Sequence, residues 1–298
     1  MNWKGLELVA DSAIIGGITL LGQAGTVFYA DTTNGSNSNS GRSLADAKAT
    51  IDAAEAAMAD GDTLLVMPGD YDEAVTITHD NITIIGLGNR GAVAVAPSAV
   101  DAVAVTVTGT AAARTSNVTL INIGGEGNGT GGGLVVEGNI RRFRAFGCKF
   151  EGGAFAAKLN STAAGSVGDT WLVDNEFAWA TTGLHLSVTG GGDPVTQTYV
   201  KDNLFHNITA DGVLADGSFS TDIWLRDNLF GAQEDGTEMT QYLDIDVAST
   251  TGLVTGNRFA TTIFSTAKFG IAAGVLFVGN FAQAEGPATG GGTSGRPD

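Results

Sequence analysis

The sequence predicts an all-β protein, a single right-handed parallel β-helix (solenoid) with an N-terminal arm and a capping α-helix. Three observations predict this fold. Glycine is abundant, at 44 of 298 residues, without the G-X-Y period of collagen. Short runs rich in β-branched residues, each closed by Gly or Asn, fill most of the chain. A short segment ending in Phe recurs at intervals that suit one solenoid coil.

The first segment, residues 1–27, is expected to form an arm or a first strand. Residues 13–21 have the length of the apolar core of a signal peptide, but Glu7 and Asp11 accompany Lys4 in the stretch before them, unlike a basic leader. The apolar run is also too short, and too interrupted by Gly, to span a bilayer. We therefore expect this segment to be retained and ordered.

A helix is predicted over 44–59, where Ala dominates and apolar residues fall at helical spacing. Ser43 precedes it and Asp46 follows three residues later, which is close to a capping box. Asp60-Gly61 ends the helix. It is expected to cap the N-terminal end of a β-helix that covers 28–285. Residues 286–298 form a Gly-rich tail.

The internal repeat is the strongest signal in the sequence. Its copies are WLVDNEF (171–177), YVKDNLF (199–205), WLRDNLF (224–230), LVTGNRF (253–259) and the shorter LFVGNF (276–281), with a degenerate copy RAFGCKF at 144–150. Successive terminal Phe residues are 27, 28, 25, 29 and 22 residues apart. The spacing fits one coil plus loops of variable length, and parallel crossovers favour a right-handed path.

The frame of the repeat predicts which side chains stack. The residue three positions before each Asn is expected to point inward, and so is the shared Phe; these inward residues before the turn are Leu172, Val200, Leu225, Val254 and Phe277. The turn holds Asn175, Asn203, Asn228, Asn257 and Asn280. Asn tolerates a left-handed backbone conformation. Coils roughly 4.8 Å apart would let these amides form a ladder.

The stretch from FYADTTNGSNSNSGRS through GDTLLVMPGDY to NITIIGLG resembles the opening of pectate-lyase-like β-helix proteins. The matching residues are Gly61-Asp62-Thr63, Pro68-Gly69 and Tyr71, and the resemblance extends over roughly 28–281. It implies the fold, and it implies that any active site lies on the outer face of the solenoid. The superfamily includes lyases, hydrolases, phage tailspikes and non-enzymatic virion proteins, so the fold leaves the function open.

Two columns of outward residues are candidate sites. Trp171, Tyr199 and Trp224 lie one position before inward residues and are expected to form a subunit contact, to bind glycans or to lie under a loop of the same chain, with Arg144 placed to stack on Trp171. The second column is Asp174, Asp202 and Asp227. These carboxylates either bind a cation or act as an acid/base pair, or they are solvated turn residues.

Composition excludes several functions. A formal charge of −17 disfavours contact with nucleic acid or an anionic membrane. The single Cys148 cannot form an intrachain disulfide and is expected to be a buried, unreactive residue. His79, His185 and His206 fall at different phases of the repeat and form no zinc motif. We therefore predict no catalytic residues, no metal and no cofactor.

We predict a structural protein of the virion surface, a capsid decoration, fibre or tail component that assembles in the host cytoplasm. It would act through contacts in a homo-oligomer, with a trimer favoured, through other virion proteins and through adhesion to carbohydrate. The alternative is a polysaccharide lyase or glycoside hydrolase of the tailspike type, working on the outer face. A bacterial adhesion module is a third option, which the absence of a convincing secretion signal disfavours.

Overall fold

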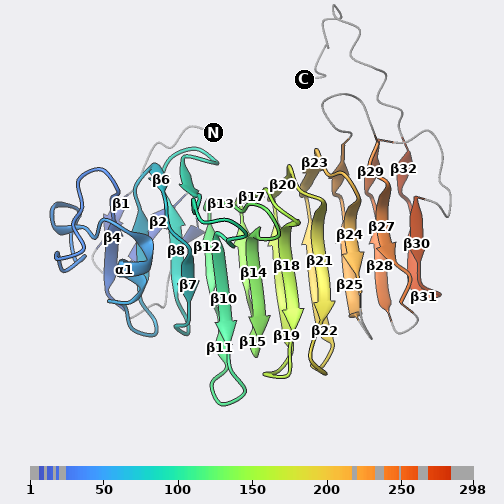
Figure 1. The fold of residues 1–298 in the computed structure, drawn as a ribbon, viewed down its shortest axis with the longest axis horizontal. Coiled ribbons are helices and arrows are strands. Elements are labelled where there is room, and N and C mark those ends of the chain that lie inside the picture. Colours follow the sequence, from blue (N-terminus) through green and yellow to red (C-terminus); the bar gives the residue numbers. More distant parts are fainter. Residues whose placement is uncertain are drawn as a thin grey trace, which may run out of the picture.

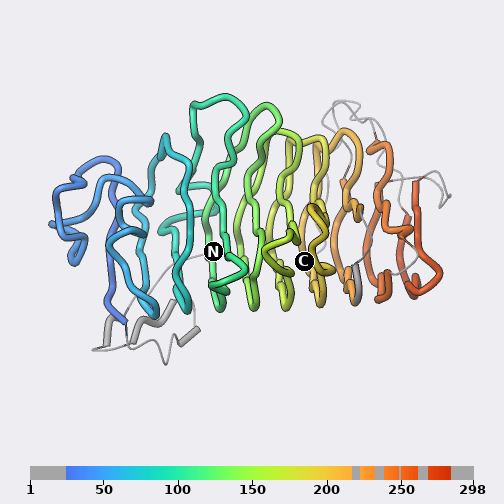
Figure 2. Tube along the Cα trace, turned by 60° about the horizontal axis from the view of Figure 1, so that its bottom comes forward, coloured from blue at the N-terminus to red at the C-terminus, as the bar shows by residue number. Residues whose placement is uncertain are grey.

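The structure is a computed structural model that describes residues 7–9, 12–15, 18–19, 25–216, 220–231, 238–247, 250–260 and 268–282. Three parallel sheets run along one long axis (Figure 1), and Figure 2 shows the successive coils of the chain side by side. This arrangement confirms the predicted right-handed parallel β-helix. Within the described residues, no helix is long and apolar enough to cross a membrane.

Each complete coil visits the twelve-, nine- and eight-stranded sheets in that order, with one strand in each, except that two coils place two short strands in the twelve-stranded sheet. The twelve-stranded sheet consists of β4 (Val27–Ala30), β5 (Thr63–Val66), β8 (Thr83–Gly86), β11 (Thr115–Ser116), β12 (Thr119–Ile121), β15 (Ile140–Arg141), β16 (Arg144–Phe146), β19 (Val167–Val173), β22 (Val195–Lys201), β25 (Ser220–Arg226), β28 (Thr251–Thr255) and β31 (Gly274–Val278). All neighbouring strands in it are parallel.

The other two sheets have the same axial order. The nine-stranded sheet consists of β6 (Gly69–Tyr71), β9 (Val93–Val95), β13 (Gly124–Glu126), β17 (Lys149–Glu151), β20 (Glu176–Ala178), β23 (Leu204–His206), β26 (Leu229–Phe230), β29 (Arg258–Phe259) and β32 (Phe281–Ala282). The eight-stranded sheet consists of β7 (Val75–Ile77), β10 (Val105–Gly109), β14 (Gly132–Gly138), β18 (Phe155–Ser161), β21 (Thr182–Val188), β24 (Asp211–Ala215), β27 (Gln241–Ile245) and β30 (Phe269–Ile271). Within 1–27, β1 (Glu7–Val9), β2 (Ser12–Ile15) and β3 (Ile18–Thr19) form a small antiparallel sheet.

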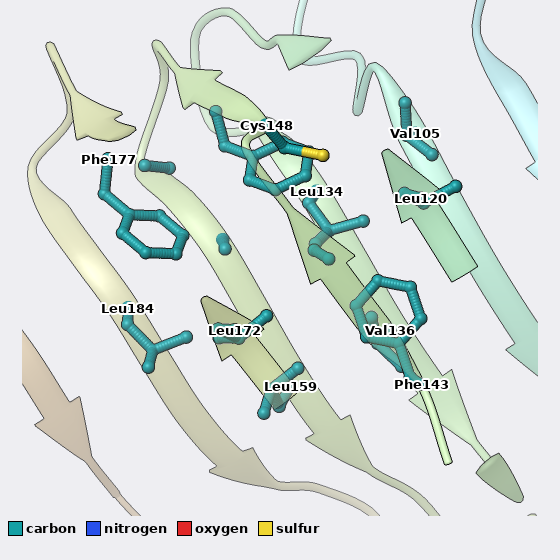
Figure 3. Close-up of a cluster of buried hydrophobic side chains, with 14 of the residues drawn as sticks. Val105, Leu120, Leu134, Val136, Phe143, Cys148, Leu159, Leu172, Phe177 and Leu184 are labelled. Carbon is teal, nitrogen blue, oxygen red and sulfur yellow. The ribbon is translucent and has the colours of Figure 1, made fainter. Parts of the chain in front are cut away.

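The core is a set of axial stacks of apolar side chains. Figure 3 shows Leu159, Leu172 and Leu184 facing one another between the sheets, with Cys148 and Phe177 nearby. All five are fully buried. The inward positions predicted from the repeat are in register from coil to coil, from Leu172 through Val200, Leu225 and Val254 to Phe277.

The Phe stack is continuous over five coils. Ring centroids of Phe177, Phe205, Phe230 and Phe259 follow one another at 4.8, 4.5 and 4.8 Å, and Phe150 lies 6.1 Å below Phe177. The prediction for Phe281 is wrong: this side chain is 60% exposed. The last copy lacks one residue after its Asn, so Ala282 pairs with Phe259 and Phe281 pairs with Arg258.

The predicted helix over 44–59 is also wrong in its extent. The structure has a 3₁₀ turn, η1 (Leu44–Asp46), and a short helix α1 (Ile51–Glu55) that packs against β4, β5 and β7 at the N-terminal end (Figure 1). Lys48 causes the break, because its N–H donates to Tyr29 O and its carbonyl accepts from Asp31 N, so this part of the chain follows β4.

The cap of α1 differs from the predicted one. Thr50 is the N-cap and accepts from Ala53 N through its side chain, whereas Ser43 makes no side-chain cap bond. The Glu73 carboxylate accepts from the N–H groups of Ile51 and Asp52 at 2.7 and 2.9 Å. These bonds satisfy donors that the first turn of a helix leaves without partners.

Candidate functional site

A row of five stacked carboxamides lies in the turn between the twelve- and nine-stranded sheets. The Oδ1 of each Asn from 203 to 280 accepts from both the backbone N–H and the Nδ2 of the Asn one coil earlier, at 2.8–3.1 Å. Each Nδ2 also donates to a strand carbonyl, as Asn228 does to Val200 O at 2.9 Å. We call Asn175, Asn203, Asn228, Asn257 and Asn280 the asparagine ladder. It fixes the turn of these five coils in one register.

The left-handed residue of this turn is not the Asn, as the sequence suggested, but the residue before it. Asp174, Asp202 and Asp227 have φ of 55°, 56° and 55°, and Gly256 and Gly279 occupy the same position with φ of 70° and 64°. This explains why the repeat reads D-N in three copies and G-N in two, because both residue types accept this conformation.

Each of the three carboxylates at this turn forms an ion pair with a different basic side chain. Asp174 Oδ2 lies 2.8 Å from Arg90 Nη2, Asp202 Oδ2 lies 2.6 Å from Lys201 Nζ, and Asp227 Oδ2 lies 3.1 Å from Arg226 Nε. The geometry fits solvated turn residues. In the described part of the chain, no group of three or more His, Cys, Asp or Glu side chains is arranged to hold a metal ion.

The outward aromatic residues form a second stack, on the outer face of the twelve-stranded sheet. Trp171 and Tyr199 are stacked at 5.5 Å and 5°, and Tyr199 and Trp224 at 4.3 Å and 8°. Leu253 and Leu276 continue the same row. We call these five residues the aromatic stripe. The three rings are half-buried, while Leu276 is 58% exposed.

The ring faces in the stripe are largely occupied. The Cζ of Arg144 lies 5.3 Å from the centroid of the Trp171 ring, so this guanidinium covers the first face. Burial lowers the pKa of Arg144, and the nearby Arg142 charge lowers it further. Sugars stack on aromatic faces, whereas this stack presents ring edges and aliphatic groups. The rings of Trp171 and Tyr199 therefore leave little open face for a stacked ligand.

The outer face of the eight-stranded sheet carries an acidic group that the sequence analysis missed. Asp211, Asp244 and Asp246 lie on β24 and at β27, and His185 Nε2 lies 2.8 Å from Asp216 Oδ2. Burial raises the pKa of Asp211 and of Asp244, and the neighbouring carboxylate raises each further. The alternation in YLDIDV, with Asp at every second position, was the available signal.

Comparisons with known proteins address the fold. No family model matches the sequence, and no curated protein matches it. The pectin methylesterase from Aspergillus niger is 14% identical over 92% of this chain and 89% of that chain, with a TM-score of 0.49. Rhamnogalacturonan lyase is 11% identical over 86% and 87%, with a TM-score of 0.39. ORF18 of Geobacillus virus E2 is 12% identical over 76% and 54%, with a TM-score of 0.38. The strand order and registers of this chain themselves establish it as a parallel β-helix.

Proposed function

We propose that this chain is a structural protein that works as a homo-oligomer on a virion surface, as a capsid decoration, fibre or tail component. The aromatic stripe is the observation that carries the proposal. It extends along the solenoid axis through five successive coils and presents ring edges and leucines at the outer face. A stripe parallel to a symmetry axis can face that axis in every copy at once, as a trimer requires.

The charge distribution also favours contact between copies at the face that carries the aromatic stripe. The chain carries −17, so like copies repel over most of their surface. The outer side of the twelve-stranded sheet holds basic side chains beside the stripe: Arg144 precedes Trp171 in the same row, and Lys201 and Arg226 lie two residues after Tyr199 and Trp224. These cations offset the carboxylates beside them, as Lys201 does for Asp202 and Arg226 for Asp227, so repulsion between copies is smaller here than at the aspartates of the eight-stranded sheet.

Oligomeric mass tests the proposal. We expect light scattering of the purified chain to give about 90 kDa, three copies of 30.2 kDa. Tyr199→Lys places a charge in the middle of the stripe and is expected to give the monomer mass. Leu229→Lys is the matched control, because Leu229 is 42% exposed on the nine-stranded sheet. A wild-type monomer at micromolar concentration, or a Tyr199→Lys variant that keeps the wild-type mass, would contradict the proposed contact.

The virion setting has a separate test. An elongated solenoid with its contact stripe along the axis suits a fibre or spike subunit. Mass spectrometry of purified particles should then find the chain in fixed stoichiometry with other virion proteins. Recovery of the chain only as a free species in cell lysate would argue against this setting and leave the homo-oligomer standing.

A polysaccharide lyase or hydrolase is the second candidate. One observation favours it: the raised pKa values of Asp211 and Asp244 give the outer face of the eight-stranded sheet carboxyls that hold protons more readily than usual. A screen of neutral and acidic polysaccharides, with Asp244→Asn beside the wild type, tests it. Cleavage that disappears in Asp244→Asn would establish the enzyme, and the absence of cleavage of any polymer would remove it.

A further inference from the structure

One turn of the solenoid departs from its neighbours at Trp179. Strands β17, β20 and β23 are in register from coil to coil, so the residues that directly follow them occupy equivalent positions. These residues are Gly152, Trp179 and Asn207. All three have a left-handed backbone, with φ of 81°, 53° and 52°. Gly and Asn tolerate this conformation, whereas a bulky aromatic residue is strained in it.

Burial does not offset the strain at Trp179. The side chain is 49% exposed, although indole is among the largest apolar groups a chain can bury. Neighbouring coils show that Gly or Asn fills the position. A strained residue that keeps its side chain in solvent is typical of a binding position, not of a packing position.

The surroundings of Trp179 are polar and fixed. His206 lies edge-on to the indole, with ring centroids 6.5 Å apart and planes at 74°. His206 Nε2 is 3.1 Å from Glu176 Oε1, and Asn207 Nδ2 is 2.9 Å from His206 Nδ1. The neutral imidazole with its proton on Nε2 satisfies both contacts, since it donates to the carboxylate and accepts from the amide. The histidine is thereby locked beside the tryptophan.

Glu176 supplies an acceptor at this place. The hydrogen bond from His206 holds the pKa of Glu176 below its usual range, so the carboxylate is ionised at neutral pH. Its side chain is 21% exposed, and Oε1 is the atom that contacts His206, which leaves Oε2 to accept hydrogen bonds from hydroxyl groups. Lys149 and Arg90 act on this carboxylate, but the chain as a whole carries −17, and this net charge disfavours anionic ligands.

From these observations we infer that Trp179, with Glu176 and His206 beside it, is a binding site for a neutral sugar unit of a glycan. The apolar face of a pyranose packs on the indole, and its hydroxyl groups donate to Glu176. The stripe offers no equivalent platform, because Arg144 and the neighbouring rings cover the faces of Trp171 and Tyr199, and Trp224 lies between Tyr199 and Leu253 in the row. The site lies within one chain and does not depend on the proposed homo-oligomer.

Calorimetric titration of the full chain tests the inference. The probes are maltohexaose, cellohexaose and mannohexaose, with hexagalacturonate as the anionic comparison. We expect at least one neutral hexasaccharide to bind and the anionic one not to bind. Trp179→Asn should weaken binding by at least about tenfold, whereas Trp179→Phe, which keeps a ring, should retain most of it. No binding of any neutral probe, or equal binding by Trp179→Asn, overturns the site.

Stability provides the control that separates a binding role from a structural one. Asn and Gly suit the left-handed backbone, so Trp179→Asn and Trp179→Gly should raise the melting temperature by about 2–4 °C while binding is lost. A fall in melting temperature in both variants would make Trp179 a packing residue. A change in oligomeric mass in Trp179→Asn would make it a protein contact. Either result overturns the inference, and it does so whether or not the aromatic stripe forms a contact between copies.

Discussion

The asparagine ladder allows a quantitative prediction at Asn228, which is 1% exposed. Asn228→Ala removes the Oδ1 that accepts from Asn203 N and Asn203 Nδ2 at 3.0 and 2.9 Å, and the Nδ2 that donates to Val200 O. A buried polar group left without a partner costs about 1–3 kcal/mol. Two such donors on Asn203 therefore predict a loss of about 2–6 kcal/mol in the free energy of unfolding.

Asn280 is the matched control, because it occupies the last rung. Its Oδ1 accepts from Asn257 N and Asn257 Nδ2 at 3.0 and 2.9 Å, the same bonds as at Asn228, but Asn280 itself is only half-buried. Water can replace the missing acceptor there, so Asn280→Ala should cost about 0.5–1.5 kcal/mol. Urea unfolding followed by far-UV circular dichroism measures both variants. Equal losses at the two positions, or a loss below about 1 kcal/mol at Asn228, would refute the reasoning.

Three further predictions follow from burial and charge. Because burial raises the pKa of Asp244, the folded chain holds its proton more tightly than the unfolded chain, and stability falls as pH rises through the folded pKa. At pH 7, Asp244→Asn should therefore have a higher melting temperature than the wild type. Below pH 3.8, the ordinary pKa of aspartate, the two proteins should melt at the same temperature. A variant that melts below the wild type at pH 7 would count against this. Burial raises the pKa of Cys148 to about 12, so Ellman's reagent should label it only after unfolding, and rapid labelling of the native chain at pH 8 would disagree. Glu73→Ala removes the acceptor of Ile51 N and Asp52 N and should cost about 1 kcal/mol in urea unfolding, and an unchanged midpoint would show that α1 does not need this cap.

The sequence was sufficient to predict which residues of successive coils stack on one another along the solenoid axis. Leu172, Val200 and Leu225 could be aligned because a shared Asn and Phe fix the frame in which inward positions recur. The same frame placed Trp171 and Tyr199 on the outer face. These features repeat, and repetition along a solenoid translates directly into neighbours in space.

The rest depended on tertiary contacts or on single residues. Helical spacing over 44–59 could not show that Lys48 would bond to the backbone of Tyr29 and Asp31. The left-handed residue was misplaced by one, because Asp and Asn both tolerate that conformation and only coordinates distinguish them. Trp179 was overlooked, although it stands two residues after its Phe, where the neighbouring copies have Gly152 and Asn207.

Whether another copy covers the aromatic stripe is decided most directly by a cryo-electron microscopy map of the purified, assembled protein. We predict copies with parallel solenoid axes whose Trp171, Tyr199 and Trp224 edges are buried against one another around a common axis. A map in which these three residues face solvent, while a different sheet makes the contact between copies, would contradict this prediction.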